Sequence, residues 1–403
     1  MYRRIVFAAA QGVSFSDAAE ALAELGELKI LPKRVWRAAK RIGEERMIER
    51  REAAARYEQL PLPAQRQSPT GQTPQLACVQ MDGGRLQQRE RIPSSTASEA
   101  LAAEDADAPQ KDGFWKEYKA GLLMSMQSDV HAADPCPMLP ATFADPGKMR
   151  EMSREIKGFT TESPLSLQAD EGRERESERR AGRPEVLVKS VVATTGDVNA
   201  FGPLLASAAY ERGFHAAVRK AFVADGSSTN WSVWRKFFSH YTPILDFVHA
   251  LMYVYAGAMT GRSVNEGWSC YRDWAQWLWS GEAAKIIAAL RLRQQELGVP
   301  EAKETGTPRA QVAASLAYLS NQQERMKYDE YRKQGLPLTS SPMESTVKQI
   351  NRRLKGTEKF WSGGADPMLH LVADRLSQTQ ALDKFWSRRT NSLIAAACFQ
   401  QAA

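Results

Sequence analysis

Apolar residues recur along this chain at two different spacings. In residues 14–50 and 260–336 they recur every three or four positions, which is typical of helices that bury one face. Between these regions, short apolar runs alternate with helical segments and predict strands at residues 76–81, 85–91, 114–127, 186–195, 217–224 and 243–249. The first three runs follow one another directly, which favours an antiparallel start to a sheet. The later alternation of strand and helix favours α/β architecture with parallel neighbours.

The same pattern divides the chain into segments. They are, in order, a helical segment (1–60), a proline-containing linker (61–75), the first part of a mixed-sheet core (76–250), a helical insertion (251–337) and the C-terminal helices of the core (338–403). Residues 94–110 are small and polar and predict a loop. Residues 131–183 are rich in Pro, Asp, Glu and Arg and predict a long mobile insertion in the core, with a short helix near residues 147–158.

The first segment predicts two helices. Ser14 with Asp17 is typical of a helix cap, Gly26 ends the first helix, and Pro32 begins the second. The second helix carries an outward basic face made of Lys33, Arg34, Arg37, Lys40 and Arg41. Two interpretations stay open. The pair is a helix-turn-helix whose second helix binds DNA, or a helical hairpin whose basic face is only solvated.

Residues 338–361 predict a second notable helix. Ser340, Ser341 and Pro342 indicate its start, with a hydroxyl cap before a proline. Its apolar stripe is formed by Val347, Ile350 and Leu354. Beside the stripe lie one acid and several bases, namely Glu344, Lys348, Arg352 and Lys355. They suit a metal-binding carboxylate followed by phosphate-binding cations, or a surface helix with a Glu344–Lys348 pair.

Two further acids follow apolar strands, and each precedes a glycine: Asp82 in VQMDGG and Asp225 in FVADGS. The strand ends of open α/β sheets commonly hold the functional site, and a glycine allows a phosphate to approach the backbone. With Glu344, these aspartates would supply the hard oxygen ligands for two Mg²⁺ ions. For each aspartate alone, the plain alternative is a turn residue at a strand end.

Asp246, in ILDFVH, is a competing acid with His249 three residues later. It could contact a metal or orient Asp225, but a structural role at the strand end is favoured. His249 is expected to begin a helix or lie in the core, not to bind a metal.

The composition of the chain indicates what kind of partner it binds and where in the cell it is found. The 403 residues carry a net charge of +7 and a pI of about 9.1, which suggests an acidic partner such as nucleic acid. Cys78, Cys136, Cys270 and Cys398 are far apart, so neither a zinc knuckle nor a disulfide framework is supported. No stretch approaches 18 apolar residues, so we expect a cytoplasmic protein without a membrane segment.

Four blocks of the sequence resemble bacterial insertion-sequence transposases of the DDE superfamily. They are VQMDGGRL, FVADGSSTNW, PILDFVHALMYV and SSPMESTVKQINRRLKGTEKFW, within a similarity that extends over about residues 76–375. The last block, in which a glutamate opens a helix that continues through Lys and Arg to a Trp, is the most specific.

The resemblance implies an RNase H-like catalytic core with residues 250–336 as a helical insertion. It makes Asp82, Asp225 and Glu344 a triad that binds two Mg²⁺ or Mn²⁺ ions, and it implies no small-molecule cofactor. The expected activity is DNA transposition: hydrolysis at the element ends, then attack of the released 3′-hydroxyls on target DNA, by a homo-oligomer near the nucleoid. The alternatives are an RNase H-like nuclease or resolvase without strand transfer, and a non-catalytic DNA-binding protein.

Overall fold

The computed structural model describes residues 1–89, 114–154, 183–355, 360–361 and 363–402. The predicted loop at 94–110 lies outside the described residues, and so do residues 155–182 of the predicted insertion. The described part of that insertion contains a 3₁₀ turn at Ala141–Phe143 and the helix α6 (Pro146–Ser153), close to the predicted short helix.

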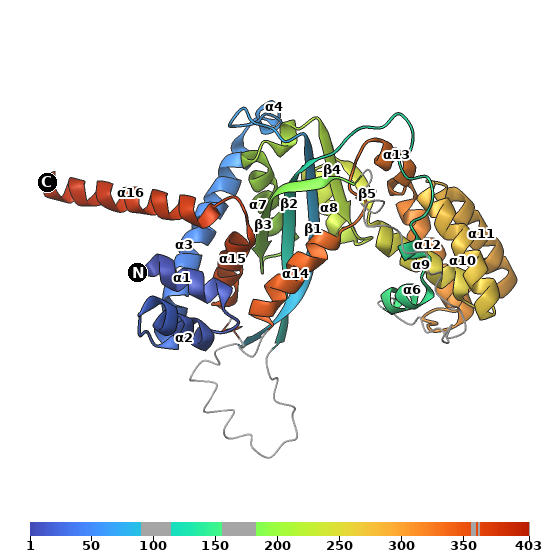
Figure 1. Cartoon of the computed structure of the whole chain (residues 1–403), viewed down its shortest axis with the longest axis horizontal. Coiled ribbons are helices and arrows are strands. Elements are labelled where there is room, and N and C mark those ends of the chain that lie inside the picture. Colours follow the sequence, from blue (N-terminus) through green and yellow to red (C-terminus); the bar gives the residue numbers. More distant parts are fainter. Residues whose placement is uncertain (90–113, 155–182, 356–359, 362, 403) are drawn as a thin grey trace, which may run out of the picture.

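A five-stranded mixed sheet forms the centre of the molecule (Figure 1). Its strands are β1 (Leu76–Arg89), β2 (Phe114–Gln127), β3 (Glu185–Thr194), β4 (Arg219–Ala224) and β5 (Thr242–Leu245). They lie in the order β3-β2-β1-β4-β5, and the two-residue strand β6 (Phe360–Trp361) pairs with the far end of β1. β2 is antiparallel to β1 and β3, whereas β4 and β5 run parallel to β1. The α/β class and the mixed sheet are therefore confirmed.

Two predicted strand boundaries are wrong. The strand predicted at 243–249 ends at Leu245, because Asp246 caps a helix that begins at Phe247. The sequence suggested a turn at Asp82-Gly83-Gly84 and a separate strand at 85–91, but β1 continues through these residues in unbroken register with β2. The two glycines do not form a turn but allow Tyr118 of β2 to pack closely against β1. A Cβ on Gly84 would overlap the Tyr118 ring, and a Cβ on Gly83 would overlap the Tyr118 carbonyl oxygen. Asp82 consequently lies within a long strand and not at its end.

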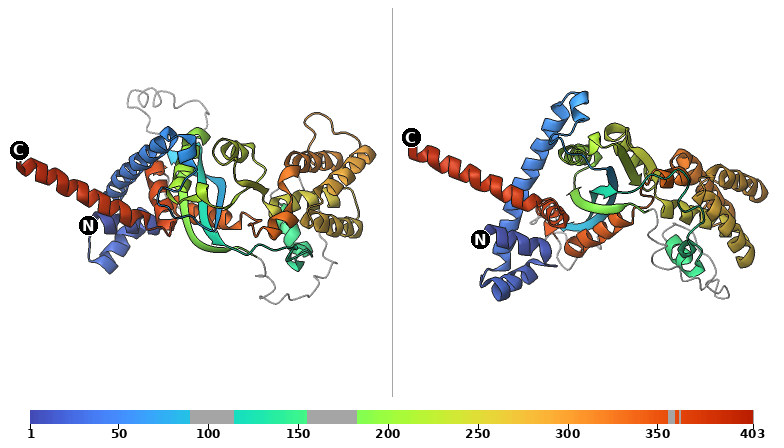
Figure 2. Two further views of the ribbon diagram at one scale, coloured as in Figure 1. Left: turned by 90° about the horizontal axis from the view of Figure 1, so that it is seen from above. Right: turned by 45° about the horizontal axis from the view of Figure 1, so that its top comes forward.

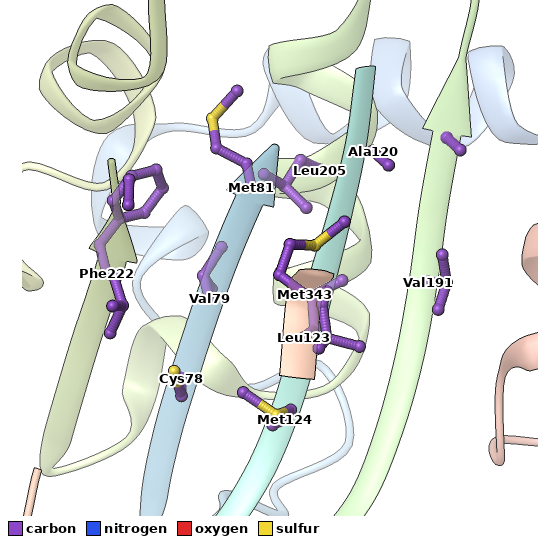
Figure 3. Packing of buried hydrophobic residues seen from close by; sticks show 14 of the residues in the cluster. Cys78, Val79, Met81, Ala120, Leu123, Met124, Val191, Leu205, Phe222 and Met343 are labelled. Carbon is purple, nitrogen blue, oxygen red and sulfur yellow. The ribbon is translucent and has the colours of Figure 1, made fainter. Parts of the chain in front are cut away.

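Helices cover both faces of the sheet. α14 (Ser341–Leu354) packs on one face of β1 and β2, where Tyr118 donates a hydrogen bond to Asn351 Oδ1 at 2.9 Å. α7 (Val198–Glu211) packs on the other face, because Gly121, three residues along β2, lies against Leu205. Met343 of α14 is fully buried (Figure 3). Both faces are thus core, and α14 is fixed over the middle of the sheet.

The N-terminal helices are α1 (Tyr2–Gln11), α2 (Phe15–Gly26) and α3 (Pro32–Gln59). α2 begins as predicted, since the backbone N–H of Asp17 donates to Ser14 Oγ at 2.9 Å. α1 was not predicted. α3 is long, and besides contacting α1 and α2 it packs on α7 and on α15 (Ala365–Leu376). A four-residue helix, α4 (Leu62–Gln65), lies in the predicted linker.

A helical segment follows β5, where the helical insertion was predicted. Its helices are α9 (Phe247–Met259), α10 (Val264–Trp279), α11 (Ala283–Leu297), α12 (Pro308–Gln322) and α13 (Tyr328–Lys333). Figure 2 shows the sheet between these helices and α1–α3. Trp268, Trp274 and Trp279 of α10 are buried and belong to the core. The remaining helices are α8 (Ser228–Phe237) and the projecting α16 (Ala381–Ala402), and no helix among the described residues could span a bilayer.

Candidate functional site

Three aspartates lie in a row where β4 and β5 end. Gln80 of β1 is in register with Val223 of β4, so Asp82 and Asp225, two residues further on, occupy matching positions. Ala224 is in register with Leu245 of β5, which places Asp246 beside Asp225, and the Asp246 N–H donates to Ala224 O at 2.8 Å. Residues in register on neighbouring strands point to the same face, and for Asp82 that is the face covered by α14.

Asp225 is held by its own loop and by α8. Its Oδ1 accepts hydrogen bonds from the Ser227 N–H at 2.9 Å and from Asn230 Nδ2 at 2.7 Å. The buried Asn230 amide also reaches Met81 O at 3.5 Å, next to Asp82 in β1. Asn230 therefore joins the two strand positions. No hydrogen bond from a described residue to the other oxygen, Oδ2, is found.

Asp246 is fully buried and caps α9. Its Oδ1 accepts from the backbone N–H of His249 at 2.8 Å and lies 3.0 Å from His249 Nδ1, while its Oδ2 accepts from the Ser340 N–H. Burial would raise the pKa of Asp246, but the His249 and Ser340 hydrogen bonds hold it below its usual value. The favoured interpretation of Asp246 as a structural strand-end residue fits these contacts.

The pKa of His249 is affected by the charges of two predicted metal ligands, Asp225 and Glu344. Burial would lower its pKa, but the hydrogen bond and charge of Asp246, with further contributions from Asp225 and Glu344, raise its pKa to about 9. The imidazolium form is therefore favoured at neutral pH. Glu344 and Asp225 are both close enough to this ring for their charges to matter.

The start of α14 is tied to the same strand ends. Gln80 Nε2 donates to Thr339 O, and the Phe247 N–H donates to Leu338 O, each at 2.9 Å. Ser340 occupies the predicted cap position, but its side chain makes no capping hydrogen bond; its backbone N–H binds Asp246 instead. Pro342 lies in the first turn, as predicted. These bonds hold the start of α14, and the charge of Glu344, one turn into the helix, reaches the His249 ring as that of Asp225 does.

We call Asp82, Asp225, Asp246 and Glu344 the acidic edge. Its carboxylate oxygens are the hard donors that Mg²⁺ and Mn²⁺ take, and Oδ1 of Asp225 is already held by Ser227 and Asn230. As the side chains lie, no three His, Cys, Asp or Glu residues in the described part of the chain are grouped closely enough to hold a metal ion. The donor chemistry fits a divalent cation, and its binding by Asp82, Asp225 and Glu344 stays a prediction.

A cavity lies beside the acidic edge. It has a volume of about 780 Å³ and borders Glu344 and Gln80, but none of the three aspartates. Its wall is mostly apolar and includes Met124, Met126, Met138, Phe143 and Trp279. The three aspartates therefore lie outside the wall of this cavity.

The predicted DNA-binding cations lie on two surfaces. On α3, Lys33, Arg34, Arg37 and Arg41 are exposed and Lys40 is partly exposed. Two of these are paired with acids on the same helix, Lys40 with Glu44 and Arg41 with Glu45, each at 3.5 Å. On α14, Lys348, Arg352 and Lys355 are exposed, C-terminal to Glu344. The ammonium of Lys355 lies 5.8 Å from the ring centroid of the exposed Trp115.

Sequence reasoning missed Asn230, which touches Asp225. A polar residue on the apolar face of a helix that begins just after an acidic strand end was the available signal. The comparisons add no further residue: no protein-family model matches the sequence, and no curated protein is significantly similar to it.

Proposed function

We propose that this protein is a DNA transposase with an RNase H-like core and a DDE triad, Asp82, Asp225 and Glu344. The observation that supports the proposal is the register of β1 and β4, which sets Asp82 and Asp225 at matching positions. The anchored start of α14 adds Glu344, whose charge reaches His249 as that of Asp225 does. The strand order and directions are consistent with an RNase H-like core. The choice of DNA transposition as the reaction rests on the resemblance of the four sequence blocks to DDE transposases.

In this proposal Asp82, Asp225 and Glu344 hold two Mg²⁺ or Mn²⁺ ions. Such ions, when bound, activate a water or 3′-hydroxyl and neutralise the leaving oxygen of the phosphodiester. Asn230 holds Asp225 Oδ1, and Oδ2 would be the oxygen that binds a cation. The charged His249 and buried Asp246 hold the start of α14 in place. The edge then orients a phosphate for in-line attack.

DNA would be bound by the exposed cations on either side. Lys348, Arg352 and Lys355 continue from Glu344 along the outer face of α14, where they can pair with successive phosphates. The basic residues of α3 would bind the element ends. Pairing of two ends calls for more than one copy of the chain, so the proposed acting form is a homo-oligomer on DNA.

The test uses purified protein and DNA that carries the sequences flanking its own coding region, with Mg²⁺ or Mn²⁺. We expect the wild type to cut this DNA and join the ends to a target, and Asp82→Ala and Glu344→Ala to lose activity by at least about a thousandfold. Asp273→Ala, an exposed acid of α10, is the control and should act like the wild type. Equal activity of all four proteins, or cutting without a divalent metal, would refute the proposal.

The product decides between the alternatives. Cut but never joined DNA indicates an RNase H-like nuclease or resolvase. Binding that persists in EDTA, with no cleavage in Mg²⁺, indicates a non-catalytic DNA-binding protein.

A further inference from the structure

The loop that carries Asp225 is covered by a helix of the insertion. Tyr318 of α12 packs directly on Gly226, so that a Cβ at this glycine would overlap the ring at Cε2, Cζ and Oη. The backbone of Gly226 does not have the positive φ that would itself require glycine. Position 226 therefore excludes a side chain because the Tyr318 ring fills the space that a Cβ would need.

Tyr318 cannot easily move aside. Its ring stacks on Tyr253 of α9 with 3.7 Å between the centroids and 12° between the planes. One turn further along α12, Gln322 Nε2 donates to Gly226 O at 3.3 Å, and Gln322 Oε1 accepts from Arg325 Nη1 at 2.7 Å. Gln322 is buried. The backbone at Gly226 is thus held by ring packing and a hydrogen bond, both from α12.

The electrostatics agree with this proximity. Burial, and then the negative charge of Asp225, raise the pKa of the Tyr318 phenol, and the same two causes raise the pKa of Tyr253. Both rings therefore lie near the carboxylate as well as the glycine. Ser227 and Asn230 hold Asp225 from the other side of the loop.

We infer that Tyr318 and Gln322 are positioning residues for Asp225, so that the helical insertion sets the affinity of the site for its divalent cation. The inference rests on the proposed function for the role of Asp225 as a ligand. It assigns the insertion a role at the acidic edge, since α12 lies among the helices beside the sheet (Figure 1) and contacts the loop after β4 through Tyr318 and Gln322. Displacing that loop by a fraction of an ångström would misalign Oδ2.

The experiment measures Mn²⁺ binding by calorimetry on the full chain, and the Mn²⁺ concentration for half-maximal DNA cleavage. We expect Gly226→Ala to weaken Mn²⁺ binding by about tenfold or more, as for other residues that orient ligands. Gly226→Ala combined with Tyr318→Ala should bind better than Gly226→Ala alone, because the overlap is gone. Tyr318→Phe alone keeps the ring and should bind Mn²⁺ with near wild-type affinity, whereas Gln322→Ala should weaken binding severalfold.

Leu319→Ala is the matched control, since Leu319 is buried in the same helix and does not touch Gly226. It should lower the melting temperature without changing Mn²⁺ affinity. Unchanged affinity in both Gly226→Ala and Gln322→Ala, or an equal loss in Gly226→Ala and the double variant, would overturn the inference. A wild type that binds Mn²⁺ through Asp225 but never cuts DNA refutes the proposed function alone. A wild type that binds no Mn²⁺ refutes both.

Discussion

Asp246, which lies beside Asp225, forms a hydrogen-bonded pair with His249. The pKa of His249 is raised to about 9 in the folded protein, against about 6.5 in an unfolded chain. A raised pKa means that the folded state binds the proton more tightly. The stabilisation is therefore complete below about pH 6.5, declines as the pH rises, and is lost through about pH 9.

Asp246→Asn removes the charge that raises this pKa. In metal-free protein we expect the titration midpoint of the His249 ring, followed by NMR, to fall from about 9 to near or below 6.5, because burial is then weakly opposed. The loss of stability between pH 6.5 and 9 should disappear with it. The ring of His215, whose pKa burial lowers to about 4, serves as the internal control and should not change. An unmoved His249 midpoint would contradict the pairing.

For individual residues, the sequence predicted the position of Asp225 but not the position of Asp82 within its strand or the residues that contact the acids. Asp225 follows its strand as expected, but Asp82 lies inside β1, because a DGG sequence fits both a turn and a close strand contact. The packing of Tyr118 over Gly84 decides between them, and it depends on a residue of another strand. Asn230 and Tyr318 were missed for the same reason: their importance lies in what they touch.

Among the elements, α14 places two adjacent arginines in opposite environments. Arg352 is exposed on the predicted DNA-binding face, whereas Arg353 is buried and donates from Nε to Ala9 O at 2.8 Å. The Arg353 guanidinium also lies over the ring of Phe15, 4.5 Å from its centroid. One face of the helix thus binds the N-terminal helices and the other meets solvent.

This difference predicts separable effects. Arg352→Ala should weaken DNA binding severalfold and reduce its salt dependence by about one phosphate contact, with little change in melting temperature. Arg353→Ala should lower the melting temperature by several degrees, because buried backbone acceptors lose their donor. Binding measured across a salt series and thermal unfolding test the pair, each variant being the control for the other. If Arg353→Ala weakens DNA binding and Arg352→Ala lowers the melting temperature, or if both variants show both effects, the assignment of the two faces of α14 is wrong.

Most elements were predictable because their periodicity is local. The spacing of Val347, Ile350 and Leu354 correctly predicted the buried side of α14, and Pro342 its beginning. The use of the Ser340 backbone instead of its hydroxyl was not predictable, since the partner, Asp246, lies 94 residues away. α1 was missed because its apolar run is short.

Contacts between residues that are distant in sequence determine how the N-terminal helices are attached to the core. The clearest is the buried carboxylate of Asp374 in α15, which binds two arginines of α3: Arg46 Nε at 2.7 Å and Arg50 Nη2 at 2.6 Å. Arg46 is 328 residues away along the chain, so no local pattern indicates the contact. Through it the long helix that bears the predicted DNA-binding residues is fastened to the core and is not joined by a linker alone.

Asp374→Ala would leave both guanidinium groups buried without their shared counter-ion. Breaking a buried pair in this way destabilises a protein by about 3–5 kcal/mol, so the free energy of unfolding should fall by that order. Asp383→Ala breaks the exposed Arg3–Asp383 pair and should change stability little, because solvent screens such pairs. Denaturant unfolding of both variants, with hydrogen exchange across α3, measures the difference. If Asp374→Ala unfolds like Asp383→Ala, α3 is held to the core by its apolar face alone, and DNA bound there would be free to move relative to the acidic edge.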